Sequence, residues 1–463
     1  MASTFTLSRS TSRDRLHHLQ NPLLSWRQWS QFRRGRLPGQ IVIQYTDRCN
    51  ASCAQCGVRK ENLYPRSTAN LDEVKRLLDS AAAQGIEAIS FTGGEPLMYL
   101  NDILEGIRYA RRVGMRYIRT GTNGFVFMGH QKAGFTDKIN RLAGALAEAG
   151  VYNFWISIDS ASVSMHERNR GLPGVMEGIH KALPIFHAHH LSPTANLGLN
   201  RYLGSEVAPP GGPFDAKAYY THFRDGFRRF YQCVYGMGFT IVNACYPMNF
   251  DANDTTSVYA ATAMTDFVSF SHAEKEQLFR AMFDTIPEFR HKLRIFTPMS
   301  ALQTLIRHYE GREDMGYACR GGIDFFFVDA KDMTTYPCGF RGDEGLGPFW
   351  DLDLQKDIDP TAWCKQCDWE CFRDPSELMG PVLELFQNPW HMVKRFWADR
   401  DYARLWATDI QYYRACDFFN AACPPNDKKL ARFTSQVPLS AAHVAPSAPR
   451  PLDLIRPSQD IAC

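Results

Sequence analysis

The feature that most constrains this chain is a run of three cysteines within eight residues. Cys49, Cys53 and Cys56 form a C-x3-C-x2-C pattern directly after the apolar run 41–45. Three thiols at this spacing usually bind one metal centre together. The alternative is that three reduced cysteines pack in a loop without a metal. Zinc normally takes four protein ligands, whereas an iron–sulfur cube held by three cysteines keeps one iron open to a small molecule. The pattern therefore indicates a metal centre with one open coordination position.

A second motif follows about one β/α unit later. The segment Thr92–Pro96 reads T-G-G-E-P and comes directly after the strand-like run 88–91. A C-x3-C-x2-C after the first strand and a G-G-E-P after the second, in this order, resemble the radical S-adenosylmethionine (SAM) enzymes. The two motifs together are more specific than either one alone.

The resemblance implies several cofactor contacts. The three cysteines would hold a 4Fe–4S cluster whose open iron takes SAM. Gly93, Gly94 and Glu95 would face the SAM amino group, because glycine permits close backbone approach and a carboxylate accepts from an ammonium. Asn123, after the third strand, is a further candidate. The family usually has an aromatic residue before its last cysteine, near the adenine, and Gln55 stands there instead, which leaves the adenine contact open.

The fourth strand carries the remaining candidates for SAM binding. Ser157 and Asp159 resemble the ribose-binding S-x-D pattern of the family, and alternation places both on one face of the strand. Arg170 resembles an arginine that pairs with the SAM carboxylate, with Arg168 as its competitor. As single residues these would otherwise be solvated loop positions. Asn196, on the fifth strand, is another candidate, or it closes a turn.

Strand-like and helix-like runs alternate six times from residue 41 on. The first helical pattern begins after the candidate N-cap Asn70. Such a repeat is typical of a parallel barrel or partial barrel, whose active site lies at the carboxyl ends of the strands. Because the radical SAM core is a six-stranded partial barrel, we expect an α/β fold with a partial six-stranded parallel (β/α) barrel. The expected strands are 41–45, 88–92, 117–120, 151–158, 194–199 and 239–244, and the expected helices are 71–83, 101–113, 136–149, 175–186 and 216–235.

Seven cysteines lie in the second half of the chain: Cys319, Cys338, Cys364, Cys367, Cys371, Cys416 and Cys423. The first four follow the order of one cysteine, a hairpin-like stretch, a second cysteine and a C-x2-C. This resembles the small α+β twitch or SPASM extension of radical SAM enzymes and implies one auxiliary 4Fe–4S cluster on those four, with Cys371 able to replace one of them. A zinc site with the same ligands is the alternative, and a second cluster would need Cys416 and Cys423.

Composition narrows the class of protein. Lys and Arg number 52 against 49 Asp and Glu, a net charge of +3 that offers no argument for nucleic acid binding. The 13 cysteines are clustered, and the N-terminus lacks the apolar region of a secretory signal. Clustered cysteines without such a signal favour metal ligation in the cytoplasm over disulfides. We expect no transmembrane segment, because no apolar run is long enough to span a bilayer.

The same patterns divide the chain into five parts. A segment with Leu23, Trp26, Trp29 and Phe32 at every third position predicts a short amphipathic helix that docks against the barrel. Aromatic-rich residues 202–270 would form a substrate wall or an aromatic core. The expected parts are a partly disordered N-terminal extension (1–39), the barrel (40–250), connecting helices (251–315), the cysteine-rich twitch/SPASM-like domain with terminal helices (316–430) and a disordered tail (431–463).

The resemblance implies an enzyme that cleaves SAM reductively to a 5′-deoxyadenosyl radical, which abstracts a hydrogen atom from substrate. Oxidation, epimerisation and cross-link formation all fit. Only about 40 residues precede the first strand, too few for a peptide-recognition domain, so a small metabolite, sugar, nucleoside or lipid precursor is favoured over a peptide. Cys245, at the end of the sixth strand, is a candidate hydrogen donor or else a buried small residue.

No reductase domain is visible in the chain, so we expect an external flavodoxin or ferredoxin as the electron donor. Two other classes of protein stay open. One is an iron–sulfur binding protein without SAM chemistry, and the other is a zinc-stapled structural protein.

Overall fold

One sheet organises the fold, and its neighbouring strands run parallel except for the last pair. The structure is a computed structural model that describes residues 26–57, 66–247, 257–259, 263, 265–312, 316–361, 363–365, 367–418 and 420–434. Within those residues nine strands lie in the order β7-β6-β5-β4-β3-β2-β1-β8-β9. Their bounds are β1 Gly39–Thr46, β2 Ile86–Gly93, β3 Tyr117–Thr122, β4 Asn153–Ser157, β5 Thr194–Gly198, β6 Ile241–Cys245, β7 Arg294–Ile295, β8 Phe325–Val328 and β9 Thr335–Tyr336.

The expected α/β fold with a partial parallel barrel is confirmed, but the sheet is wider than six strands. β8 pairs in parallel with β1 along four residues, and the short β7 pairs with β6. All eight residues of β1 are buried, so this strand needs a neighbour on each edge and cover on both faces. The run Phe325–Val328, which we expected in a hairpin of a separate domain, supplies that second neighbour and then turns into the antiparallel β9.

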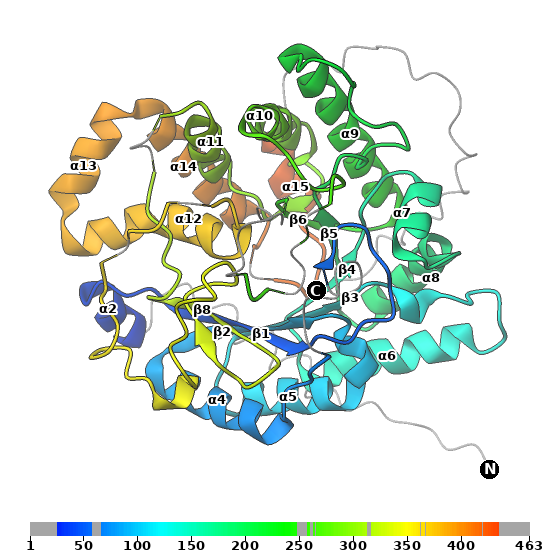
Figure 1. The fold of residues 1–463 in the computed structure, drawn as a ribbon, viewed down its shortest axis with the longest axis horizontal. Coiled ribbons are helices and arrows are strands. Elements are labelled where there is room, and N and C mark those ends of the chain that lie inside the picture. Colours follow the sequence, from blue (N-terminus) through cyan, green and yellow to red (C-terminus); the bar gives the residue numbers. More distant parts are fainter. Residues whose placement is uncertain are drawn as a thin grey trace.

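Helices surround the sheet on its outer side (Figure 1). Helix α4 shows why they form where the sequence predicts: the Asn70 side chain caps its first turn and Gly85, with φ +92°, ends it. Its Val74, Leu77 and Leu78 are buried against the strands. The helices of this layer are α4 Leu71–Gln84, α5 Leu100–Arg112, α6 Phe135–Ala149, α7 Val163–Arg170, α8 Val175–Ala188, α9 Ala216–Met237, α10 His272–Phe289 and α11 Met299–Tyr309, and short 3-10 turns lie at Pro96–Tyr99 and Phe125–Phe127.

Helix α12 (Glu370–Gln387) bridges the two sides of the open barrel. Its first turn reaches β1, because the Gln40 side chain donates to the Cys371 carbonyl. The same turn reaches the end of β6, where the Tyr246 N–H donates to the Glu370 carboxylate at 3.1 Å. It is followed by α13 Pro389–Ala398, α14 Arg400–Ala415 and α15 Asp427–Leu430, and further 3-10 turns lie at Phe349–Asp351 and Ala431–Phe433. α12 therefore connects the cysteine-rich region to the interior of the barrel.

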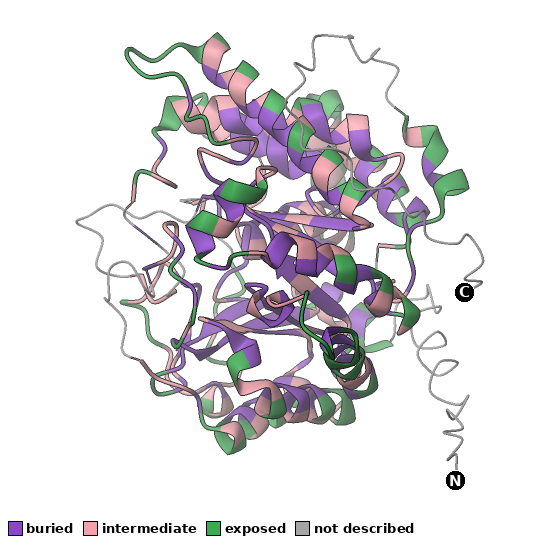
Figure 2. Ribbon diagram, turned by 90° about the vertical axis from the view of Figure 1, so that its right-hand side faces the viewer, coloured by how far each residue is buried: buried purple, intermediate pink, exposed green. Residues whose placement is uncertain are grey.

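Helix α2 (Trp26–Arg33) packs against the barrel as predicted, but through only part of the predicted pattern: Phe32 is buried, Trp26 and Trp29 are exposed, and Leu23 lies outside the described residues. Phe32 is buried and stacks on Phe386 of α12 at 5.0 Å between ring centroids. Arg27 donates to the Ala82 carbonyl at the end of α4 at 2.7 Å. Buried residues concentrate on the strands and on the inner sides of the helices (Figure 2). Among the described residues, no helix is both long and apolar enough to cross a bilayer.

Candidate active site

The cysteine loop begins where β1 ends and is held against the end of β2. The Gly94 N–H donates to the Thr46 carbonyl at 2.6 Å, and the Glu95 N–H donates to the Arg48 carbonyl at 2.9 Å. A Cβ on Gly93 or Gly94 would lie 2.2 Å from one of these carbonyl oxygens. Gly93 also has φ +138°. Both glycines are therefore required for the two strand ends to approach this closely.

The predicted Asn123 lies beside the first cysteine of the loop. Its side-chain amide donates to Cys49 Sγ at 3.6 Å and to Asn50 Oδ1 at 2.9 Å. The Ala51 N–H donates to the same sulfur at 3.4 Å. Hydrogen bonds of this kind stabilise a cysteine thiolate that binds iron. The ends of β1 and β3 thus meet at Cys49, and Cys53 is buried beside them.

Glu95 is completely buried and is bound by backbone groups. One carboxylate oxygen accepts from the Leu97 N–H at 3.0 Å and the other from the Asn123 N–H at 2.6 Å. Burial raises its pKa to about 7, although these two N–H groups oppose the shift. We infer that Glu95 joins the ends of β2 and β3, and that the backbone around Gly93 is the more accessible part of the motif.

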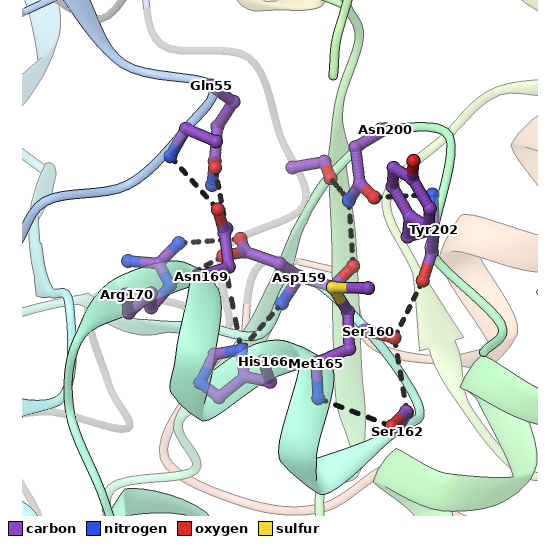
Figure 3. Close-up of polar contacts among 12 residues, drawn as sticks. Gln55, Asp159, Ser160, Ser162, Met165, His166, Asn169, Arg170, Asn200 and Tyr202 are labelled. Atoms are coloured by element: carbon purple, nitrogen blue, oxygen red, sulfur yellow. Dashed lines mark hydrogen bonds and ion pairs between the residues drawn. The ribbon is translucent and has the colours of Figure 1, made fainter. Parts of the chain in front are cut away.

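A buried network connects the end of β4 with the end of α7 (Figure 3). Arg170 donates to both oxygens of Asp159, from Nε at 2.7 Å and from Nη2 at 2.6 Å. Asn169 donates to the Asp159 carboxylate at 3.0 Å and to Gln55 Oε1 at 2.7 Å. The Asp159 N–H donates to His166 Nδ1 at 3.0 Å. The two predicted residues, Asp159 and Arg170, therefore bind each other, and the network includes Gln55 from the cysteine loop.

The same network anchors the cysteine loop through its backbone. The Ala54 N–H donates to the Asn169 side chain at 2.9 Å, and the Ser52 N–H donates to the Arg170 carbonyl at 3.3 Å. Sequence reasoning missed Asn169 and His166. Asn169 directly precedes the predicted arginine, and His166 lies four residues before it on the same helix face, so both were within reach of a helical pattern.

Nearby charge and burial shift the pKa of Asp159 in this network in opposite directions. Burial alone would raise the pKa of Asp159, but the Arg170 guanidinium lowers it below its ordinary value. Burial lowers the pKa of His166 to about 4, so this imidazole is neutral and accepts a hydrogen bond through Nδ1. Arg168, the competing candidate, has a side chain 60% exposed and pairs with Glu206 at 3.3 Å. Of the two arginines, only Arg170 lies at the site.

The strand residues that face away from the helices form the inner face of the barrel. Ser157 is in register with Asn196, and Asn196 with Asn243. The Asn196 amide donates to Cys245 Sγ at 3.3 Å and accepts from Asn243 Nδ2 at 2.8 Å. The Trp155 indole packs directly on Gly121 of β3. A Cβ placed on Gly121 would lie 2.1 Å from the nearest indole atom. This face is therefore polar and aromatic, and the predicted Ser157 and Cys245 both belong to it.

Comparison with known proteins agrees with this geometry. A family model described as the Radical SAM superfamily matches residues 43–195. An AdoMet-dependent heme synthase from Oleidesulfovibrio alaskensis is 33% identical over 349 residues, which cover 73% of this chain and 78% of that protein. The chain belongs to the radical SAM superfamily. It therefore uses a 4Fe–4S cluster and SAM as cofactors.

Two further relatives show how far the similarity to this radical SAM chain extends. An AdoMet-dependent heme synthase from Methanosarcina barkeri is 23% identical, and the match covers 74% of this chain and 87% of that protein. A GTP 3′,8-cyclase from Marinobacter nauticus is 32% identical over 154 residues, which cover 32% of this chain and 43% of that protein. The similarity to the heme synthases thus extends beyond the barrel half of the radical SAM chain.

Four cysteines outside the radical SAM core come together. Cys319 and Cys364 form an antiparallel bridge, with the Cys319 N–H donating to the Cys364 carbonyl at 2.8 Å. Burial, together with a smaller effect of the nearby Cys319 and Cys364 thiols, raises the pKa of Cys338 to about 12. Burial also raises the pKa of Cys367, and Cys319 and Cys338 add to that effect. The structure therefore groups the four cysteines that the SPASM resemblance selects.

Cys371 follows these four in the chain and contacts Glu370. Its thiol donates to Glu370 Oε1 at 3.4 Å, on the side of α12 that faces β6. Burial makes the largest contribution to the raised pKa of the Cys371 thiol. The charges of Glu370 and Cys245 also raise it, and the charge of Arg119 lowers it. Cys371 thus lies near Cys245 at the inner face of the barrel, and it also packs on the hydrophobic cluster that includes Cys338, Cys319 and Cys367.

Cys416 and Cys423 lie at the opposite, amino-terminal end of the barrel. Arg294, the first residue of β7, is fully buried and donates to the Cys416 carbonyl at 2.7 Å and to the Cys423 carbonyl at 3.4 Å. The Ser192 N–H, just before β5, donates to the Ala421 carbonyl at 2.9 Å. This segment closes the barrel floor, and its placement gives no support to a second auxiliary cluster.

The donors around the cysteine sulfurs fit iron–sulfur cubes. In a 4Fe–4S cluster each cysteine binds a different iron, so four cysteines can hold one cube and three leave one iron open. Sulfur atoms that accept N–H bonds, at Cys49 and from the Gly321 N–H at Cys319 (3.4 Å), are consistent with this donor set.

Proposed function

We propose that this radical SAM protein is an oxidoreductase that acts on a small substrate bound at the inner face of the barrel. One observation carries the proposal: the inner face lies between the two cysteine groups. The cysteine loop covers the strand ends, and the four-cysteine group leads directly into α12, whose first turn, Glu370 and Cys371, forms one wall of that face. A substrate placed there has access to both groups.

The cofactors would supply the chemistry when bound: one electron from the SAM cluster cleaves SAM and yields a 5′-deoxyadenosyl radical. Cys49, Cys53 and Cys56 would hold this cluster. Asp159, Asn169 and Arg170 fix the loop that carries them. Arg170 already donates to both carboxylate oxygens of Asp159, so a SAM carboxylate would share this guanidinium with Asp159. We propose that Ser157, the last residue of β4, binds the SAM ribose.

Cys319, Cys338, Cys364 and Cys367 would hold the auxiliary cluster, which would accept an electron from substrate. If the substrate is epimerised and not oxidised, Cys245 is our candidate to give a hydrogen atom to the substrate radical, and the thiyl radical left on sulfur would take up one proton and one electron, the electron coming from the auxiliary cluster. The Cys245 sulfur is bound to Asn196, and Glu370 lies close enough to influence its pKa after the larger effect of burial. The thiol therefore has a fixed orientation and a carboxyl group nearby.

A small substrate is favoured because segments of the β6–α10 connection cover the barrel mouth. The Val258 and Tyr259 N–H groups both donate to the Gly339 carbonyl, next to Cys338. Thr265 donates to the Ala54 carbonyl in the cysteine loop at 2.7 Å. These contacts join the candidate substrate wall to both cysteine groups. A peptide substrate, the alternative, would have to displace them.

Heme synthesis is a second candidate for the reaction. The matches to two AdoMet-dependent heme synthases cover about three quarters of this chain, more than the barrel alone. The test is formation of heme by the reconstituted protein from its porphyrin precursor with SAM and a reductant. Formation of 5′-deoxyadenosine without any change in the porphyrin would leave the small-substrate proposal and remove this one.

The deciding experiment measures iron, sulfide and 5′-deoxyadenosine in anaerobically reconstituted protein. Two four-iron clusters predict about eight irons per chain, and changing Cys49, Cys53 and Cys56 together to Ala should leave about four and abolish SAM cleavage. Zinc without sulfide would contradict the proposal. Reduced flavodoxin or ferredoxin should replace dithionite in this assay, as an external donor requires, and a cytoplasmic location would suit both the donor and the reduced thiols.

A further inference from the structure

Arg119 is a half-buried cation on the inner face of the barrel, and its Nε is fully buried. It is the third residue of β3 and lies in register with Ser90 of β2 and Asn153 of β4. Its Nη2 donates to Gln40 Oε1 on β1 at 3.0 Å. The guanidinium therefore reaches across the inner face, in the amino-terminal half of the barrel.

This guanidinium lacks a partner of opposite charge among the described residues. Its Nε is buried and has no hydrogen-bond acceptor there. Gln40 is neutral, so it satisfies one N–H without balancing the charge. Three buried arginines pair with a carboxylate, Arg170 with Asp159, Arg290 with Asp409 and Arg320 with Asp324. The buried Arg294 instead donates to three backbone carbonyls, whereas Arg119 has the Gln40 side chain as its acceptor.

Cys371 is the nearest candidate for a counter-charge, and its contacts argue against that role. Its Sγ lies 3.4 Å from Glu370 Oε1, and no hydrogen bond or ion pair joins it to Arg119 among the described residues. A guanidinium whose Nε is buried without an acceptor and without a carboxylate partner is costly to the fold, which indicates that a bound ligand supplies the missing anion.

We propose that Arg119 binds an anionic group of the substrate, a carboxylate or a phosphate. The planar guanidinium matches both groups in a bidentate manner, and its free Nε is one of the two donors needed. This inference rests on the proposed function, because it names a property of the substrate on which the radical core acts. Arg119 lies four residues before Asn123, so the anion would bind roughly 13 Å along β3 from the cysteine loop, leaving the reacting end of the substrate near the barrel mouth.

The test uses reconstituted, SAM-loaded protein and calorimetric titration with three probes. Benzoate carries a carboxylate, phenyl phosphate carries a phosphate, and benzamide is the uncharged match of benzoate. Benzoate or phenyl phosphate should bind at least about tenfold tighter than benzamide, and the tighter of the two identifies the anion. Equal binding of all three probes, or no binding of any, would overturn the proposal.

Two substitutions of Arg119 test whether this residue causes the preference for anionic probes. Arg119→Gln should abolish it, and Arg119→Lys should keep part of it, because a charge remains without the bidentate fork. Arg404→Gln, on an exposed helix face, should bind like the unchanged protein. Iron content and 5′-deoxyadenosine formation without substrate should stay unchanged in Arg119→Gln, so a loss of anion binding is separable from misfolding and from a failure of SAM chemistry. Retention of the preference in Arg119→Gln would refute the assignment.

Discussion

Arg170 and Asp159 form a buried bidentate ion pair, with distances of 2.7 Å and 2.6 Å from the guanidinium to the two carboxylate oxygens. Asp159 follows β4 and Arg170 ends α7, so the pair fixes a helix end against a strand end. Asn169 and the Arg170 carbonyl bind the cysteine loop next to it. The position of the cluster ligands therefore depends on this pair.

Asp159→Ala should destabilise the protein strongly. It leaves the Arg170 charge buried without its partner, a change that typically costs ~3–5 kcal/mol of unfolding free energy. Urea unfolding measures the loss. The control is Arg404→Ala, which removes a surface pair whose side chains are both 76% exposed and should cost less than about 1 kcal/mol. Equal losses in the two variants would show that the buried pair contributes nothing special.

Stability should fall on acidification through His166. Its pKa is lowered by burial to about 4, while in the unfolded chain it lies near 6.5. Between these values the unfolded state binds a proton that the folded state excludes, so stability is complete above pH 6.5 and decreases as the pH falls toward 4, by ~1.4 kcal/mol per unit at most. His166→Asn keeps an acceptor for the Asp159 N–H without a titratable group. Urea unfolding at pH 7.5 and 5.5 should show a smaller decrease for this variant than for the unchanged protein, and parallel decreases would argue against the assignment.

Gly94→Ala should disrupt the cysteine loop. The added Cβ would lie 2.2 Å from the Arg48 carbonyl oxygen, a backbone atom that cannot rotate away. We expect loss of iron from the SAM cluster and a fall in 5′-deoxyadenosine formation of about tenfold or more. Gly236→Ala in α9, where the new Cβ meets nothing within 4 Å, is the matched control and should be neutral or slightly stabilising. A Gly94→Ala protein with full iron and full activity would contradict the close packing described above.

Iron content should separate Cys367 from Cys371. Cys367→Ala removes one of four grouped ligands, so iron should fall from about eight to about four per chain. Cys371→Ala should retain about eight, because four cysteines already complete one cluster and the Cys371 thiol contacts Glu370. Anaerobic iron and sulfide analysis of both variants gives the answer, and a similar loss in Cys371→Ala would make it a cluster ligand.

The local patterns were sufficient for the elements and for the motif residues. The 3.6-residue spacing predicts α4 with its Asn70 cap, and α11 (Met299–Tyr309) lies where connecting helices are expected between residues 251 and 315. Cys49, Asn123 and Asp159 meet at one end of the sheet because parallel strands bring their carboxyl ends to the same edge. Such positions follow from spacing along the chain.

Other parts of the site depend on contacts between distant segments. The family resemblance predicts that Arg170 binds SAM, and the fold adds Asp159 as its buried partner while it leaves Arg119 without a carboxylate partner among the described residues. Neither outcome can be read from local sequence, since a charged side chain selects its partner among all groups that burial brings within reach.

The sequence by itself determined the radical SAM core, its cluster cysteines and the cysteines of the second half, because each depends on residue types at short spacings. Only the tertiary structure decided that β8 joins β1, that Cys371 faces the barrel and that α12 spans its open side. Those features connect residues up to about 330 positions apart, as from Gln40 to Cys371. They depend on which buried surfaces and polar groups can be satisfied together, a condition that applies only to the folded chain.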